Sequence, residues 1–429
     1  MPFLTDKRNL RRILVIGCTR GSENQGIAMS IAETEIALWP RGGQAEGFFD
    51  KLLERYHQEG RGMRVKPHWM DAKNPWADVS RTMIKRSGYD MTELGVSWVE
   101  SLVATNCLRP FTPKEFQSFG GAEAFIMPAW KSKKADADDA VYSIPYMADA
   151  RHLYYRRDLL AQAGVDETTA FNTSGNIIQT LESLKLAGVK HPFLAPIVSE
   201  RMNLSFIASW VWGAGADFID SAGSRATFDD PGAITGIADY FKAANYIAPE
   251  FRQLDVPEAD REFCRGNAAV TLSGSWLYHV LQQVPEFAPV RENLGLALPV
   301  GQASCGGTHL VIWQHSLREE AAFDFIHFLT DPQVQADLSA VNFVLPARLA
   351  ASQVSPYAND PNYQMLVQTI TSGRAYGASP FWNILEDRLS RLLVQIWPEY
   401  FETCPADVNA FLSARLGPLA RRINITLEE

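Results

Sequence analysis

The first hundred residues alternate between two kinds of hydrophobic pattern. Residues 34–40 alternate polar and apolar side chains and end at a Pro-Arg-Gly-Gly turn, which predicts a strand. Residues 44–59 have helical spacing, and Gly60 ends that helix. A second strand is predicted over 63–69 and a second helix over 75–87. This alternation predicts βαβ units with a mainly parallel sheet, and hence an α/β protein.

The run from Tyr142 to Leu160 has a different pattern. It predicts a short apolar strand ending at Pro145, a polar turn, a second strand with Tyr154 and Tyr155, and a helix start. Polar and aromatic side chains stand where the chain passes between two structural units, and ligand pockets favour such interfaces. Residues 156–198 are predicted to be largely helical.

The size and composition indicate a large globular protein. With 429 residues, the chain is too long for one ordinary core, so two or three domain-sized units are expected. Hydrophobic residues make up 46% and charged residues 21%, which argues against large disordered tracts. The net charge of −9 and the lack of a large basic cluster argue against nucleic-acid binding. Most of the 11 tryptophans are expected to pack in the core; a minority could form flat apolar platforms in a cleft, which suit sugar rings, and composition does not separate these two uses.

The sequence gives no support for catalysis, a metal site or a cofactor. It contains no GxSxG, HExxH, P-loop or GxGxxG motif. The five cysteines are scattered without ligand spacing, so we expect mainly buried free thiols and no zinc site. We expect no catalytic residue, no metal and no cofactor.

Several motifs resemble those of family 1 extracellular solute-binding proteins, the maltose- and trehalose-binding group of ABC importers. The run 142–160 resembles the family's lobe-crossing pattern Y-x-I-P…D…L-Y-Y-R-K-D-L-L. Residues 263–276 resemble F-x-x-G-x-A-A-M…G-x-W, and 206–218 resemble W…G-G-x-F. The matches follow the family's order from about residue 34 to 415, and this order carries the resemblance.

The resemblance implies a two-lobed α/β fold of the periplasmic-binding-protein type II, with three hinge crossings. The crossings are expected near 145–149, 295–299 and 341–347. Residues 1–33 are expected to be a leader of unassigned role. The first lobe is expected to comprise residues 34–146 and 299–343, and the second lobe residues 147–298 and 344–429.

The implied function is capture of a sugar or oligosaccharide between the lobes, without catalysis. The implied partners are the membrane subunits of an ABC permease, and a monomer is expected. Two alternatives stay open: a cytoplasmic solute sensor on the same fold, and a binder of iron or a charged solute. Adjacent strand residues such as Tyr154 and Tyr155 point to opposite faces, which argues against their sharing a metal.

The N-terminus leaves the location open. The resemblance implies a periplasmic or extracellular protein, but the apolar run from Ile13 to Gly17 is shorter than the roughly 7–15 residues of a signal core. The start is truncated or misassigned, or the protein is a cytoplasmic relative, or residues 1–33 are an unrelated leader.

In the first lobe, Trp39 is expected to face the ligand, because ligands of open α/β sheets bind beyond the strands' carboxyl ends. A core position is the alternative. Gln44, in a Gly-rich turn, offers an amide to a hydroxyl, although a plain turn is the favoured interpretation. Trp98 is expected in a loop that the family places at the cleft.

Around the crossing and in the second lobe, Asp149 offers charged acceptors to sugar hydroxyls. A hinge salt bridge with Arg151 is its alternative role. Trp276, at a helix start, is the preferred stacking residue, and Trp382 could equally anchor the last helix. The other predicted ligand-binding residues here are Tyr146, Trp212, Gly307 and Arg374.

Overall fold

The computed structural model describes residues 33–40, 43–61, 63–71, 74–126, 140–199, 202–376, 379 and 381–428. Residues Glu33–Glu429 form one compact unit. The predicted leader, except its last residue, and Cys18 lie outside the described residues.

The first lobe is built on a mixed sheet. Its strands β1 (Thr34–Leu38), β2 (Val65–Trp69) and β3 (Met91–Gly95) are parallel, as predicted. Strand β8 (Cys305–Ile312) pairs antiparallel with β3 and continues the sheet to β4 (Ile144–Arg156). The order is β2-β1-β3-β8-β4. Distant parts of the sequence therefore share this sheet.

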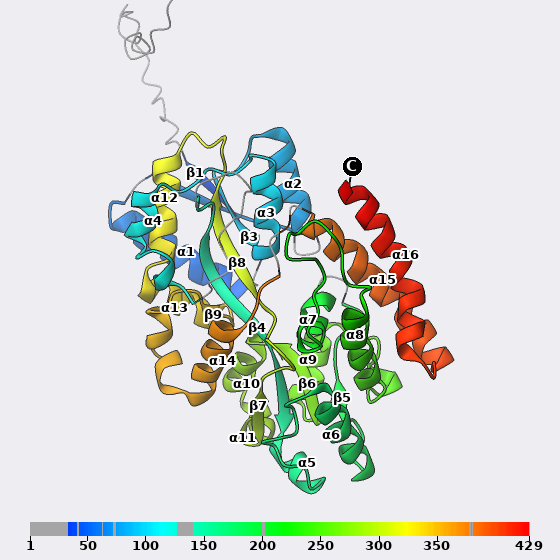
Figure 1. Cartoon of the computed structure of the whole chain (residues 1–429). Helices are drawn as coiled ribbons and strands as arrows, with labels where there is room; N and C mark the ends of the chain where they lie inside the picture. Colours follow the sequence, from blue (N-terminus) through cyan, green and yellow to red (C-terminus); the bar gives the residue numbers. More distant parts are fainter. Residues whose placement is uncertain are drawn as a thin grey trace, which may run out of the picture. The chain divides into compact units, whose positions relative to one another are not determined.

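Helices cover the sheet on both faces. α1 (Gly43–Gln58), α12 (Glu319–Leu329) and α13 (Pro332–Val341) bury aromatic and aliphatic side chains on one face. α2 (Pro75–Lys85) and α3 (Val96–Ala104) cover the other face (Figure 1). The predicted helices at 44–59 and 75–87 are confirmed.

Strand β4 connects the two lobes and corrects one prediction. Instead of two strands with a polar turn, residues 144–156 form one continuous strand. Its first half pairs with β8 and its second half with β6 (Val270–Gly274). Both halves find ladder partners, so the polar residues stay extended. Pro145 is tolerated because the register shifts between Pro145 and Met147.

The second lobe is built around the second half of β4. Strands β5 (Phe193–Leu194) and β6 lie on one side of it and β7 (Leu294–Ala297) on the other. β9 (Leu345–Pro346) instead pairs with the first half of β4. The chain therefore passes alongside β4 several times near the lobe boundary.

The prediction that 156–198 is largely helical is wrong. Only α5 (Arg157–Gln162) and α6 (Ser174–Leu186) are helical there. Gly164 and Gly188, with φ of 66° and 83°, lie in the turns after these helices. Their left-handed conformation favours glycine and does not continue a helix.

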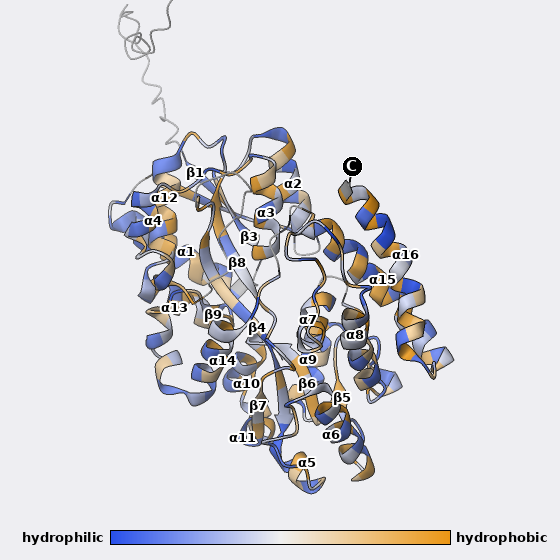
Figure 2. Ribbon diagram, viewed as in Figure 1, coloured by the Kyte–Doolittle hydropathy of each residue, from blue (hydrophilic) through white to orange (hydrophobic). Residues whose placement is uncertain are grey.

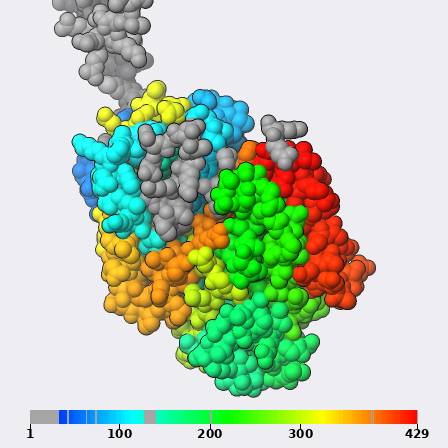
Figure 3. Space-filling view, in the orientation of Figure 1, coloured from blue at the N-terminus to red at the C-terminus, as the bar shows by residue number. Residues whose placement is uncertain are grey.

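The other helices complete the unit. α7 (Asn203–Gly213) packs against α8 (Pro231–Ala244). The C-terminal helices follow, with α15 (Trp382–Thr403) packed against α7 and α16 (Val408–Glu428) against α8. Figure 3 shows the green α7–α8 region against the red C-terminal helices. Hydrophobic and hydrophilic residues mix along α15 and α16, whose apolar residues join the core of this lobe (Figure 2). The bounds are α4 (Pro113–Ser118), α7 (Asn203–Gly213), α8 (Pro231–Ala244), α9 (Val256–Cys264), α10 (Trp276–Gln283), α11 (Ala288–Glu292), α14 (Pro361–Ser372), α15 (Trp382–Thr403) and α16 (Val408–Glu428).

Several side-chain predictions can be compared with the core. Tyr154 and Tyr155 point to opposite faces of β4, as expected: one hydroxyl donates to the Gly274 carbonyl and the other to Glu167. Four of the cysteines are free thiols, three of them buried and one, Cys404, exposed. No helix among the described residues is long and apolar enough to cross a membrane.

Candidate ligand-binding site

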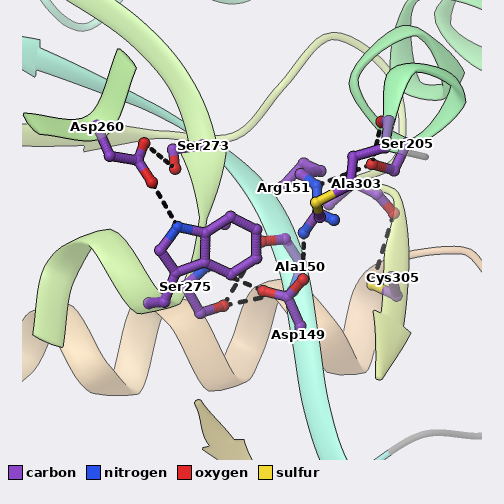
Figure 4. A network of polar contacts seen from close by, with 12 residues as sticks. Asp149, Ala150, Arg151, Ser205, Asp260, Ser273, Ser275, Ala303 and Cys305 are labelled. Carbon is purple, nitrogen blue, oxygen red and sulfur yellow. Dashed lines mark hydrogen bonds and ion pairs between the residues drawn. The ribbon is translucent and has the colours of Figure 1, made fainter. Parts of the chain in front are cut away.

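The centre of the candidate site is the middle of β4, where the strand changes partners. Alternation along the strand places Asp149 and Arg151 on the same face, and their side chains form an ion pair. Asp149 Oδ1 also accepts the Ser275 N–H at 3.0 Å, and Arg151 Nε donates to Ser205 Oγ at 3.0 Å (Figure 4). The exposed fractions of the two side chains are 14% and 7%, so the pair is largely shielded from water.

Trp276 extends this network into the second lobe. The Arg151 guanidinium lies 4.9 Å from the centroid of its ring and 5.2 Å from that of Phe206. The indole N–H donates to Asp260 Oδ2 at 2.6 Å, and Ser273 Oγ donates to the other oxygen at 2.6 Å (Figure 4). Burial raises the pKa of Asp260 to about 6, although both hydrogen bonds lower it. The geometry gives Trp276 several protein partners and leaves its ring half-buried.

A tryptophan cluster lies at the carboxyl ends of β1 and β3 in the first lobe. Trp39 stacks on Trp98 with ring centroids 5.3 Å apart, and Trp76 meets Trp98 edge-on at 5.1 Å. The Trp39 indole donates to the Glu93 carbonyl at 3.1 Å. Trp98 lies in α3 and not in a loop, because the helix begins directly after Gly95. Trp39 and Trp98 are thus brought together.

A second aromatic cluster lies in the second lobe. The Trp212 indole donates to Asp217 Oδ1 at 3.1 Å, and the Arg374 guanidinium lies 4.9 Å from the Trp212 ring. Arg374 forms an ion pair with Asp217. Tyr376 stacks on Trp382 with centroids 4.2 Å apart and contacts Trp212 at 5.7 Å. Three of the predicted residues, Trp212, Arg374 and Trp382, therefore share one cluster.

The remaining predicted residues lie outside these groups. Gln44 is exposed on the first turn of α1, and Tyr146 is buried in the first-lobe core. Gly307 lies against β4: a Cβ there would come within 2.0 Å of the Met147 carbonyl oxygen. Its φ of 132° also favours glycine. The approach of two strands accounts for this glycine without a ligand.

Sequence reasoning missed three residues at the start of α15 and just before it. Tyr376 joins the aromatic cluster, and its hydroxyl is shielded from water. The Asn383 carboxamide is buried and makes no hydrogen bond within the described part of the chain. Burial raises the pKa of Glu386 to about 7, while the Ser97 hydroxyl and the Trp382 indole lower it. One feature of the sequence could have indicated Glu386: Trp382 and Glu386 are four residues apart, so in a helix they lie on the same face.

The charges of the site are largely compensated within the protein. Asp149 pairs with Arg151 and Asp217 with Arg374, and the two further carboxyl groups, Asp260 and Glu386, have pKa values raised to about 6 and about 7, which reduces their negative charge. Among the described residues, no group of three or more His, Cys, Asp or Glu side chains could hold a metal ion. The residues at the middle of β4, the first-lobe tryptophan cluster and the second-lobe aromatic cluster each combine aromatic faces with hydrogen-bonding groups.

Two lobes joined by a shared strand, with aromatic and polar side chains at the junction, define a two-lobed binding protein. A family model of bacterial extracellular solute-binding proteins matches residues 51–365. The chain belongs to this family, and its fold is that of the two-lobed binding proteins.

Relatives and solved structures agree with this assignment. A protein of Brucella abortus (strain 2308) named as a binding protein is 19% identical over 404 residues, which cover 90% of this chain and 92% of the relative. Maltose-bound MalE3 of T. maritima matches with a TM-score of 0.74 and 20% identity, covering 91% of this chain and all of its own. A solute-binding protein of Agrobacterium vitis S4 with bound D-mannitol matches with a TM-score of 0.72 and 18% sequence identity. The match covers 92% of this chain and 99% of the A. vitis protein.

Proposed function

We propose that this protein captures an uncharged sugar or polyol between its two lobes and delivers it to an ABC permease. The observation that carries the proposal is the group of Asp149, Arg151 and Trp276 on and beside β4, the strand that joins the lobes. Aromatic faces suit the apolar faces of sugar rings, and carboxylates suit pairs of hydroxyls. Structural neighbours with bound maltose and D-mannitol support the same ligand class.

Three parts of the junction are proposed to contact the ligand. They are Asp149 and Trp276 at the crossing, the Trp39–Trp98 pair in the first lobe, and the cluster of Trp212, Tyr376 and Trp382 in the second. The Asn383 amide, which makes no hydrogen bond within the described residues, adds hydrogen-bonding capacity for ligand hydroxyls. The compensated charges of the site argue against a strongly charged ligand.

Ligand contacts with both lobes would stabilise the closed form, because a ligand shifts a conformational equilibrium only through its differential affinity. We propose hinge crossings near 145–149, 295–299 and 341–347, with a first lobe of residues 34–146 and 299–343 and a second of 147–298 and 344–429. A monomer without enzymatic activity suffices for this role.

A thermal-shift screen tests the ligand class. The panel contains maltose, trehalose, D-mannitol and ribitol, with glucuronate, amino acids and ferric citrate as charged controls. A ligand at about 100 times its Kd stabilises by roughly 2.7 kcal/mol. Titration calorimetry then gives the affinity of any compound that raises the Tm. Stabilisation by a charged control and by none of the neutral compounds would refute the proposal.

A further inference from the structure

An acidic residue interrupts the buried face of α9. This helix packs against β6, and its residues Val256, Phe263 and Cys264 are buried. Asp260 lies four residues after Val256 and four before Cys264, so it belongs to the same face of the helix. A carboxyl group at such a position lowers stability unless its oxygens are hydrogen-bonded. The partners of these oxygens therefore indicate what Asp260 does.

Both carboxylate oxygens of Asp260 accept a hydrogen bond, and the two donors differ in kind. The Ser273 hydroxyl donates to Oδ1 at 2.6 Å, and the Trp276 indole N–H donates to Oδ2 at 2.6 Å (Figure 4). Ser273 is buried in β6, so its bond fixes the carboxyl group against the sheet. The Trp276 ring is only partly buried. Asp260 thus connects a buried strand residue to a partly exposed ring.

Two further contacts act on the same ring. A Cβ at position 274 would come within 2.1 Å of Trp276 Cζ3, so the six-membered ring lies directly against the backbone of Gly274. The Arg151 guanidinium lies 4.9 Å from the ring centroid. The Asp260 bond adds a restraint at the N–H edge of the indole. Together these contacts define one orientation of the ring beside β4.

We propose that Asp260 is a positioning residue, which holds the Trp276 ring in the orientation that stacks on the sugar. The inference rests on the function proposed above, in which Trp276 contacts the ligand. A ring that is held before the ligand arrives loses less conformational freedom on binding, so the affinity is higher. Asp260 acts through Trp276 and does not itself contact the sugar.

Hydrogen exchange of the indole N–H groups, followed by nitrogen-15 NMR without ligand, measures this positioning directly. Trp276→Phe and Trp212→Phe identify the two signals needed. Asp260→Leu removes both acceptors, and the Trp276 N–H should then exchange at least about tenfold faster. Asp260→Asn keeps a carbonyl oxygen and should restore most of the protection. The Trp212 N–H, bonded to Asp217 at 3.1 Å in the same lobe, is the internal control and should keep its native rate.

Titration calorimetry with maltose measures the consequence for binding. Asp260→Leu should weaken maltose binding about threefold to tenfold, because the free ring must be ordered when the sugar binds. Asp260→Asn should weaken it by no more than about twofold. In a Trp276→Phe background, Asp260→Leu should change the affinity by less than about twofold, since no indole N–H remains to be held.

A native exchange rate of the Trp276 N–H in Asp260→Leu, or an equal increase at Trp276 and Trp212, would overturn the proposal. Faster exchange with unchanged maltose affinity would also overturn it. Should Asp260→Leu fail to fold, Asp260→Ser replaces it with the same expectations, because the serine side chain is too short to reach the indole. The exchange measurement uses no sugar, so failure of the sugar screen and failure of this inference are distinguishable.

Discussion

Asp149 shows how one side chain can serve two roles at a lobe junction. One carboxylate oxygen accepts a backbone N–H of the second lobe, and the other holds the buried Arg151. The Arg151 guanidinium in turn lies near the rings of Phe206 and Trp276. Removing the Asp149 charge would leave a largely buried guanidinium without its anion, so the residue contributes to the folded state before any ligand arrives.

Asp149→Asn should therefore lower the free energy of unfolding by about 2–4 kcal/mol, because one partner of a shielded ion pair is lost. Asp158→Asn is the matched control. Asp158 also pairs with an arginine two residues away, but its side chain is 38% exposed. The free energy of unfolding of Asp158→Asn should therefore fall by no more than about 1 kcal/mol. Urea unfolding of both variants measures the difference. Equal stability of Asp149→Asn and the native protein, with roughly tenfold weaker ligand binding, would assign Asp149 to the ligand alone.

Single residues also show what the sequence could and could not predict. The sequence predicted Trp39 beyond the carboxyl end of its strand because that relation is local, whereas it predicted a loop for Trp98, which lies in α3. The pairing of Arg374 with Asp217 joins residues 157 positions apart, and the approach of Glu386 to Ser97 depends on how the lobes pack. Contacts of this kind depend on tertiary structure, which local patterns do not encode.

Among the elements, β4 carries the connection between lobes. Motif order and hydrophobic spacing predicted the strands and helices around it, but the polar residues of the crossing predicted a turn. The structure keeps them extended because β8, β6 and β7 supply backbone partners along its length. Local β-propensity does not predict pairing with strands that lie more than a hundred residues away in the sequence.

The tight approach of β8 to β4 gives a prediction at this scale. Gly307→Ala should destabilise the protein by about 2–4 kcal/mol, since the new methyl group meets the Met147 carbonyl oxygen and φ is 132°. Gly306→Ala, one residue earlier, has no neighbouring atom within 4 Å and should cost less than about 1 kcal/mol. Denaturant unfolding of the two variants side by side tests this. Similar stabilities would show that the strands separate easily at this point.

At the scale of the whole molecule, buried histidines make stability depend on pH. Burial lowers the pKa of His152 and His279 to about 4 and that of His309 to about 3. His309 Nδ1 lies 2.8 Å from Ser143 Oγ, and His279 Nδ1 lies 2.8 Å from the Tyr363 hydroxyl. All three are neutral in the folded protein at neutral pH, whereas in the unfolded chain they titrate near 6.5.

Below pH 6.5 the unfolded chain binds more protons at these histidines, so their effect is to lower stability as the pH falls. From pH 7 to pH 5 each histidine should remove about 2 kcal/mol. Asp260 and Glu386, whose pKa values are raised to about 6 and about 7, act in the opposite direction and offset about 3 kcal/mol together. A net decrease of about 2–3 kcal/mol in the free energy of unfolding is therefore expected between pH 7 and pH 5, measured by urea unfolding at pH 7, 6 and 5.

His309→Gln should reduce this decrease by about 2 kcal/mol, however stable the variant is at pH 7. If the variant loses as much stability between pH 7 and pH 5 as the native protein, His309 is not a source of the acid sensitivity.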